Sequence, residues 1–354
     1  MKILIIVRSM CHGGAEKQVV VDANTLQKNG HKVTIAYHKN GSLLTLLNKD
    51  VDLYKVKTKN IFIASCILFR HLIKSKYDVI LAHMFWAEKV ASIPSKLTGH
   101  KLILVEHGLG LWRKWYHILI MKFIASLADK VLCTCESTLR IRIEKEGLNS
   151  KKLSILYNSF ELTESTGIEM TQEIKQRDYF TIGYVGRFNK IKRIKTFIEI
   201  AKKLRKNIEK FKIILVGDGE EKKRIEEEIS RNHFNEYFSL TGFVLSPSQY
   251  YQSFDIFILP SKREAFSVAL LEASASGIPC LAFDTGGNAE IIQDAKTGFI
   301  LPDYNINQMV NKILLLYENP AIRKQMGIEA KRFVTERFSV ERRISLFEKL
   351  LNEA

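Results

Sequence analysis

The segment FTIGYVGRFNKIKRIKTFIEIAKKL, residues 180–204, contains the most informative structural pattern in the chain. Residues 180–186 are mostly apolar and end in glycine, which predicts a short buried strand. Residues 194–204 place apolar side chains at helical spacing and predict an amphipathic helix. A strand that passes through a short polar loop into a helix is the repeating unit of a parallel α/β sheet.

The same unit recurs on both sides of this segment. Apolar runs that predict strands lie at 2–7, 32–37, 78–83, 101–107, 130–135, 153–157, 180–186, 211–217, 237–242, 256–261 and 279–283. Helical stretches such as 14–28 and 85–97 lie between them. Repeated strand–helix alternation favours parallel sheets covered on both faces. The predicted fold is therefore α/β, with two Rossmann-like domains facing each other across a ligand cleft.

The alternation stops once, at ELTESTGIEMTQEIKQRD, residues 161–178. This stretch is polar and has no clear apolar period, so we interpret it as a linker. It separates an N-terminal domain, 1–160, from a C-terminal domain, 179–335, and leaves a helical segment at 336–354. A chain of 354 residues is long enough for two domains that each bury a core.

Charge is distributed unevenly along the chain. Residues 1–160 carry 25 Lys and Arg against 11 Asp and Glu, so +14 of the total +16 lies in this half. A basic half attracts anions such as lipid head groups, nucleic acid or a phosphorylated substrate, although it can also serve only to keep a surface soluble. The cysteines number five, which is odd, and none has the spacing of a zinc site. This pattern favours reduced thiols in the cytoplasm. No apolar run is long enough for a spanning helix, so we expect any membrane contact to be peripheral.

Two cations follow the strand at 180–186. In the loop GRFNKIK, residues 186–192, Arg187 and Lys192 project from the carboxyl end of a strand, where ligands bind in such sheets. A guanidinium and an ammonium that converge there suit a diphosphate leaving group, because they neutralise its growing charge. Solvated surface cations are the alternative.

A second loop, PSKREAFSVALLEA at 260–273, leads from a strand into a helix that begins near Ser267. The free N–H groups at such a helix start can bind phosphate. Glu264 lies just before this helix start. Because a carboxylate is repelled by phosphate, Glu264 needs a different partner, and sugar hydroxyls that donate hydrogen bonds to it are suited to this role. Glu272 lies on an otherwise apolar helix and also needs a partner, for which a ribose diol is suited; a solvent-facing position is the alternative.

These motifs resemble those of a known family. Glu264 and Glu272, with seven residues between them, match the E-x7-E motif of retaining glycosyltransferases. The G-R-x-x-x-x-K element at 186–192 matches as well, and so do GDG at 217–219, TGGNAE at 285–290 and KTGFILP at 296–302. From Lys2 to about Leu351 the chain resembles glycosyltransferase family four, the group-one family with the GT-B fold.

The resemblance implies roles for the residues of the C-terminal half, which becomes the nucleotide-sugar domain. Arg187 and Lys192 resemble the pair that binds the donor diphosphate. Glu264 resembles the glutamate that faces the donor sugar. Phe266 and Ser267 would supply backbone groups near the phosphates.

Further roles follow from the same resemblance. Glu272 resembles the ribose-binding glutamate. In the N-terminal, acceptor-binding half, Gly13 and Gly14 resemble the loop that approaches the donor phosphate and the acceptor, and His107 resembles the histidine that reaches the transferred sugar. The helix at the C-terminus returns to the N-terminal domain in this family. The expected catalytic residues are His107, Glu264, Arg187 and Lys192.

The chain departs from the family pattern at two positions. Ala265 stands where glycine is common, and Arg193 stands where glycine or asparagine is common. Ala265 would restrict its loop if a positive φ were required there. His83, which ends the strand at 78–83, either lines the acceptor side or packs in the core.

A metal-binding motif is a weaker candidate. Asp50 and Asp52 form a D-x-D pattern, but they lie far from the other motifs, so we interpret the pattern as chance. Arg187 and Lys192 already supply the positive charge that a metal would bring. We therefore expect no metal and no cofactor other than the donor substrate.

Aromatic and basic residues alternate at 109–123, in the basic half. Trp112, Trp115 and Phe123 beside cations are typical of an interfacial helix at an anionic bilayer, and an ordinary core-facing helix is the alternative. The expected function is retaining transfer of a hexose from a UDP-sugar to a lipid-linked sugar or glycolipid, in cell-surface polysaccharide synthesis at the cytoplasmic side of the membrane. The alternatives are a nucleotide-sugar epimerase on this fold and a basic nucleic-acid-binding protein, for which no recognition motif is present.

Overall fold

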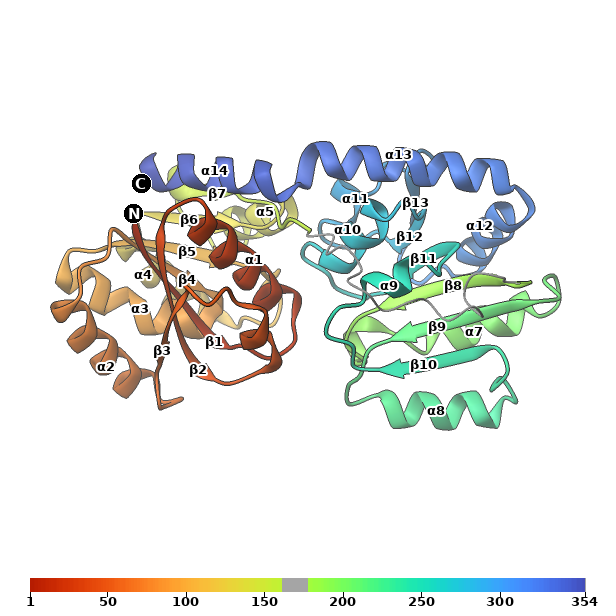
Figure 1. The fold of residues 1–354 in the computed structure, drawn as a ribbon, viewed down its shortest axis with the longest axis horizontal. Coiled ribbons are helices and arrows are strands. Elements are labelled where there is room, and N and C mark those ends of the chain that lie inside the picture. Colours follow the sequence, from red (N-terminus) through yellow and green to blue (C-terminus); the bar gives the residue numbers. More distant parts are fainter. Residues whose placement is uncertain (161–177, 354) are drawn as a thin grey trace. The chain divides into compact units, whose positions relative to one another are not determined.

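The structure is a computed structural model that describes residues 1–160 and 178–353. Two compact units form the chain, and each contains one parallel sheet with helices on its faces (Figure 1). Unit 1 comprises residues 1–159 and the segment from Val340 onward, and unit 2 comprises 160–339. Apart from Asp178, the linker expected at 161–178 lies outside the described residues.

Unit 1 is built on a seven-stranded sheet in which every strand pair is parallel. Its strands, in spatial order, are β3 (Asp52–Lys55), β2 (Lys32–Lys39), β1 (Lys2–Ser9), β4 (Val79–His83), β5 (Lys101–Glu106), β6 (Lys130–Cys133) and β7 (Leu153–Ile155). Its helices are α1 (Gly14–Lys28), η1 (Ser42–Leu46), α2 (Ile61–Lys74), α3 (Met84–Thr98), α4 (Trp115–Leu127), α5 (Glu136–Glu144), η2 (Ser150–Lys152) and α14 (Val340–Glu353).

Unit 2 is built on a six-stranded sheet that is also parallel throughout. Its strands, in spatial order, are β10 (Phe238–Gly242), β9 (Phe211–Val216), β8 (Phe180–Val185), β11 (Ile256–Leu259), β12 (Cys280–Phe283) and β13 (Gly298–Leu301). Its helices are η3 (Lys190–Lys192), α7 (Thr196–Leu204), α8 (Lys222–Arg231), α9 (Ser248–Tyr251), α10 (Val268–Ala275), α11 (Asn288–Ile291), α12 (Ile306–Glu318) and α13 (Pro320–Phe338).

The two sheets confirm the Rossmann-like prediction. Central strands are largely apolar because both faces are covered; β4 and β11, for example, are buried at every residue. The apolar runs therefore marked the strands to within a few residues. The helix at 14–28 was predicted with the bounds that α1 has, whereas α2 and the short strand β13 were not predicted.

Strand order determines where a ligand can bind. In both sheets the order runs outward from a central pair, β1 with β4 and β8 with β11, where the chain changes direction across the sheet. At such a switch point the loops after the two strands leave the sheet on opposite faces and open a crevice at the carboxyl ends. The residues after β1, β4, β8 and β11 are therefore the first candidates for a site.

The C-terminal helix α14 packs in unit 1 through a buried ion pair. The Arg343 guanidinium donates to both carboxylate oxygens of Asp22 on α1, at 2.6 and 2.7 Å. Asp22 is fully buried, and Arg343 is 4% exposed. Arg343 also donates to the carbonyl oxygens of Leu156 and Tyr157, so one side chain joins α14, α1 and the end of the N-terminal segment.

Candidate functional site

Arg187, Lys192 and Glu264 lie at the switch point of unit 2. Arg187 and Lys192 follow β8, and Glu264 follows the neighbouring strand β11. Lys192 Nζ lies 2.7 Å from both carboxylate oxygens of Glu264, and both side chains are mostly buried. The structure thus brings these two predicted residues together and gives Glu264 a partner that the sequence did not suggest.

A tight turn holds Lys192 in this position. The Asn189 side chain accepts a hydrogen bond from the Lys192 N–H at 3.1 Å, which caps η3. Arg193 then adopts a left-handed conformation with φ of 50°, which explains why smaller or more permissive residues are common there. Its guanidinium pairs with Asp303 and stacks over the Tyr304 ring at 4.8 Å, and these contacts offset the strain. Ala265, by contrast, does not adopt a positive φ, so its side chain does not strain the loop.

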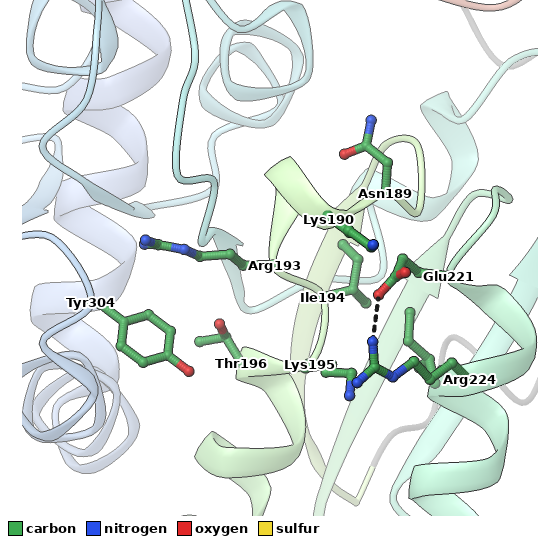
Figure 2. Close-up of a pocket in the computed structure, with 10 residues that line it drawn as sticks. Asn189, Lys190, Arg193, Ile194, Lys195, Thr196, Glu221, Arg224 and Tyr304 are labelled. Atoms are coloured by element: carbon green, nitrogen blue, oxygen red, sulfur yellow. Dashed lines mark ion pairs between the residues drawn. The ribbon is translucent and has the colours of Figure 1, made fainter.

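A pocket of about 260 Å³ lies beside this turn (Figure 2). Its lining residues are Asn189, Lys190, Arg193, Ile194, Lys195, Thr196, Glu221, Arg224, Ile225 and Tyr304. None of these is a predicted site residue. Its cations are largely balanced by carboxylates, since Lys195 pairs with Glu228 and Arg224 lies 3.8 Å from Glu221. Most of the positive charge on this pocket is therefore already neutralised within the protein, which makes the pocket a weaker candidate for a diphosphate site.

The TGG segment supports the loop that carries Glu264. A Cβ on Gly286 would lie 1.6 Å from the Glu264 carbonyl oxygen, and Gly286 has a φ of 56°. Glycine is therefore required at this position for two separate reasons. The neighbouring Gly287 N–H donates to the Ala265 carbonyl at 2.7 Å. Two motifs that are distant in sequence thus form one rigid wall of the site.

Helix α10 begins where the sequence predicted a helix start. The Ser267 hydroxyl caps it by accepting from the Leu270 N–H at 3.3 Å. Phe266 is buried against the Phe338 ring, so its backbone is fixed in place. Glu272 is 5% exposed and accepts a hydrogen bond from the Tyr251 hydroxyl at 2.8 Å. The solvent-facing alternative for Glu272 is therefore wrong.

The predicted residues of unit 1 also lie at its switch point. Gly13 and Gly14 follow β1, and Gly13 is the N-cap of α1. A Cβ on Gly13 would lie 2.1 Å from a carboxylate oxygen of Glu16, which folds back over the start of the helix. His107 directly follows β5, one strand further along the same edge of the sheet.

His107 has a partner, His83, at the end of β4. His83 Nδ1 lies 2.9 Å from His107 Nε2, and the two rings are stacked with centroids 5.1 Å apart. Burial first, and then the nearby Arg343 guanidinium, lower the pKa of His107 to about 4, against an opposing effect of Asp22 and Glu106. Burial also holds the pKa of His83 well below its usual range. Both rings are therefore neutral near pH 7, and one donates to the other.

A buried network of charges holds the loop that follows His107. The Arg142 guanidinium donates to the Gly108 carbonyl at 2.7 Å and pairs with Glu106 and Glu146. Arg113, which belongs to this loop, pairs with the same two glutamates. Burial alone would raise the pKa of Glu106, but these guanidinium groups keep it below its usual value. The network was not identified from sequence, because it joins a loop after β5 to helix α5, about 30 positions further along the chain.

The D-x-D pattern lies elsewhere. Asp52 begins β3, at the amino end of an edge strand, whereas the candidate residues lie at carboxyl ends. Both Asp52 and its neighbour Lys32, 3.8 Å away, are exposed. Among the described residues, no cluster of three or more His, Cys, Asp or Glu side chains has the geometry of a metal site.

Two family models together match most of the chain. The model described as Glycosyltransferase Family 4 matches residues 12–164, and the model described as Glycosyl transferases group 1 matches residues 167–333. The two matches meet at residues 165–166, a few residues after the division between the two structural units at Ser159 and Phe160.

Relatives of known name are similar at low identity. A poly(ribitol-phosphate) alpha-N-acetylglucosaminyltransferase of Staphylococcus aureus is 30% identical over 172 residues, which is 48% of this chain but only 34% of that protein. The chain therefore spans about a third of the length of that relative. A UDP-Gal:alpha-D-GlcNAc-diphosphoundecaprenol alpha-1,3-galactosyltransferase of Escherichia coli is 22% identical, over 94% of this chain and 91% of the other.

Solved structures have the same fold. HepE from Anabaena, in complex with UDP-glucose, superposes with a TM-score of 0.88 at 21% identity and full coverage of both chains. At this identity the likeness establishes the fold alone. With two consecutive family models over residues 12–333 and this architecture, the chain belongs to the group 1, family 4 glycosyltransferases, a retaining family with the GT-B fold.

Proposed function

We propose that the chain transfers a hexose, with retention at the anomeric carbon, from a UDP-sugar to a lipid-linked sugar or glycolipid acceptor. The reaction would serve cell-surface polysaccharide synthesis at the cytoplasmic face of the membrane. The observation that carries the donor half of this proposal is the Lys192–Glu264 pair at the switch point of unit 2, with Arg187 on the same loop. The uridine nucleotide is supported by the name of the E. coli relative, which includes UDP-Gal, and by the Anabaena HepE structure, which is a complex with UDP-glucose.

The proposed chemistry follows from the charges at this switch point. When the glycosidic bond breaks, negative charge grows on the leaving diphosphate, and Arg187 and Lys192 would neutralise it. Lys192 is held by both carboxylate oxygens of Glu264, which orients its ammonium group. A bound nucleotide sugar would replace part of the Lys192–Glu264 hydrogen bonding: its diphosphate would accept from Lys192, and its sugar hydroxyls would donate to Glu264. In a front-face mechanism the leaving phosphate accepts the acceptor proton, so no side chain is needed as a strong base.

The donor site can be tested by removing its cations. Arg187→Ala and Lys192→Ala should each lower turnover, measured as UDP release from a UDP-sugar, by at least 100-fold, because about 3 kcal/mol of charge stabilisation is lost. The matched control is Lys190→Ala, an exposed lysine on the same short helix that faces the pocket of Figure 2 instead. Near-normal activity in both test variants would contradict the proposed site. Formation of an epimer from the donor alone would favour the epimerase alternative.

Metal independence is part of the same proposal. We expect turnover to survive excess EDTA, because two cationic side chains neutralise the diphosphate where a divalent ion would otherwise be required. The measurement is the initial rate with EDTA and after re-addition of Mg²⁺ or Mn²⁺. Loss of activity with EDTA that either ion restores would show that a metal takes part.

The acceptor half of the proposal is supported by the surface of unit 1. Helices α2, α3 and α4 lie side by side on one face of the sheet, where their inner residues share one core. Their outer faces and the turn before α4 carry large apolar side chains that are 39% to 78% exposed. These are Phe62, Ile63, Ile73, Ile93, Leu97, Leu111, Trp112, Trp115, Tyr116, Leu119, Ile120 and Phe123. We call this set the apolar helix surface.

Charge on this surface suits an anionic bilayer. Arg70, Lys74, Lys96 and Lys122 lie exposed on the three helices. Across α2, α3 and α4, all of which the structure describes, the single acidic residue is Glu88, and it is fully buried. Aromatic and aliphatic anchors among cations, with no opposing exposed carboxylate, are the pattern of an interfacial membrane-binding surface. A diphosphoundecaprenol acceptor, of the kind named for the E. coli relative, would reside in such a membrane.

A further inference from the structure

Tyr251 and Glu272 form a buried hydrogen-bonded pair in unit 2. Tyr251 is the last residue of α9, and Glu272 lies in the middle of α10. The Tyr251 hydroxyl donates to Glu272 Oε2 at 2.8 Å; its next nearest acceptor, the Ala269 carbonyl, is at 3.4 Å. Tyr251 is 1% exposed and Glu272 is 5% exposed. A phenol has one proton, so the shorter contact decides which oxygen receives it.

The pair has a clear energetic reason. A carboxylate taken out of water needs hydrogen bonds from the protein, because an unpaired buried charge is costly. Burial raises the pKa of Tyr251 well above its usual range, and the charge of Glu272 raises it further, so the phenol keeps its proton and remains a donor. The other side chains of α10 are mostly apolar and offer no such donor.

The Tyr251 ring is itself held tightly. It packs edge-on against Phe254 at 5.9 Å and tilted against Phe257 at 6.0 Å between ring centroids. Phe254 in turn fills the space beside β8 that a Cβ on Gly183 would occupy, since that Cβ would lie 2.1 Å from the Phe254 ring. The direction of the Tyr251 hydroxyl is therefore determined by packing against the central strands of the sheet.

We propose that Tyr251 is a positioning residue that orients the Glu272 carboxylate toward the ribose hydroxyls of the donor nucleotide. The inference rests on the proposed donor site, in which Glu272 binds the ribose. The Tyr251 hydroxyl occupies one carboxylate oxygen and limits rotation of the carboxylate. The Glu272 carboxylate is then already oriented when the ribose hydroxyls bind, so less free energy is lost in ordering it.

The test uses Tyr251→Phe, which keeps the ring and its packing and removes only the hydroxyl. Binding is measured by calorimetry with UDP, GDP and ADP and with their 2′,3′-dideoxy analogues, so that the outcome does not depend on the base. We expect the variant to bind the tightest of the three nucleotides about tenfold more weakly than the unchanged chain. We expect it to bind the matching dideoxy analogue with unchanged affinity, because that analogue has no ribose hydroxyls for Glu272. In turnover, KM for the nucleotide sugar should rise while kcat stays within about twofold.

Matched variants separate a positioning role from a merely structural one. Tyr250→Phe changes the adjacent tyrosine of the same short helix and should leave both affinities unchanged. In a Glu272→Gln background, Tyr251→Phe should have almost no further effect on affinity, because the two residues act through one contact. An equal loss for the ribose and dideoxy nucleotides, or an additive loss in the double variant, would overturn the inference. This cycle remains informative even if Tyr251→Phe lowers stability.

The possible failures are distinguishable. If Glu272→Gln weakens binding of the ribose nucleotide and Tyr251→Phe does not, the positioning role is wrong and the donor site stands. If the unchanged chain binds one of the nucleotides and neither variant alters that affinity, Glu272 is not the ribose contact, and the donor site must be placed elsewhere. If none of the three nucleotides binds the unchanged chain, both the inference and the proposed donor specificity are contradicted.

Discussion

At the scale of single residues, the structure places a histidine pair where the sequence suggested one functional histidine. His107 Nε2 is engaged by His83 Nδ1, so this nitrogen is not available to a ligand while the pair persists. Among the described residues, the remaining nitrogens, His107 Nδ1 and His83 Nε2, have no hydrogen-bond partner. Any proposed contact between His107 and the donor sugar must therefore use Nδ1, or it must break the pair.

The histidine pair predicts how stability depends on pH. Because burial lowers the pKa of both histidines, the unfolded chain binds more protons than the folded one below about pH 6.5. Stability should therefore be constant above this pH and should fall as the pH drops toward 4, by about 1.4 kcal/mol per pH unit for each histidine. The measurement is urea unfolding at pH 7, 6 and 5 by tryptophan fluorescence. All three tryptophans lie in unit 1, so this signal reports the unit that holds the pair.

The variants for this prediction are His107→Asn and His233→Asn. The first should flatten the dependence on pH, because it removes one buried group that titrates. The second changes an exposed histidine with a φ of 55°, a conformation that asparagine tolerates, and should keep the slope of the unchanged chain. An identical slope in all three proteins would show that the buried pair does not control the pH dependence.

At the scale of elements, α2 and α4 differ from ordinary surface helices. Each packs one stripe on the core, Ala64, Leu68 and Leu72 in α2 and Met121, Ile124 and Ala125 in α4. The opposite side of such a helix is normally polar, but here it is largely apolar as well. Within the described residues, no helix has the length and apolar character needed to cross a bilayer. We explain the outer apolar side by the proposed contact with a membrane surface.

This explanation predicts binding to anionic vesicles. Unchanged protein should float with vesicles that contain phosphatidylglycerol and should bind phosphatidylcholine vesicles much less, and added salt should reduce the binding. Trp112→Ala with Trp115→Ala should lower the remaining salt-resistant binding, and Phe62→Ala should lower it further, because apolar area is lost. The matched control is Ile322→Ala with Ile328→Ala, two residues of α13 that are 46% and 52% exposed. Equal binding to both vesicle types, or binding to neither, would favour a soluble acceptor.

At the scale of the whole molecule, unit 1 is assembled from two distant parts of the chain. Residues 1–159 and the segment from Val340 form one compact body, although 180 residues of unit 2 separate them in sequence. The Asp22–Arg343 ion pair lies in this interface and is almost completely buried. Loss of one partner would leave the other as an unpaired buried charge, which is costly.

Arg343→Ala should therefore destabilise unit 1 by about 3 to 5 kcal/mol in urea unfolding followed by tryptophan fluorescence. A second substitution, Asp22→Asn, should restore part of this loss, because it removes the unpaired charge. Arg342→Ala, an exposed neighbour on the same helix, is the control and should change stability by less than about 0.5 kcal/mol. A small effect of Arg343→Ala would show that water reaches Asp22 when the pair is broken.

The fold and the position of each motif along it could be predicted from the amino-acid sequence. Strands covered on both faces must be apolar throughout, and the glycine-containing turns that end them are local, so both can be read from short windows. The same reasoning placed Arg187, Lys192 and Glu264 in loops that follow strands, and Glu272 on the helix after the second of these loops. The functional roles of these residues remain proposals.

Which side chains contact one another became visible only in the folded chain. Lys192 pairs with Glu264 across 72 positions, and Arg343 pairs with Asp22 across 321. Tyr251 and His83, the partners of Glu272 and His107, were not identified as partners from sequence, since neither pair follows from helical or strand periodicity. Strand order and helix packing bring these residues together. A carboxylate or an imidazole in a buried position needs a partner, and the sequence shows this need, but only the packed fold decides which side chain meets it.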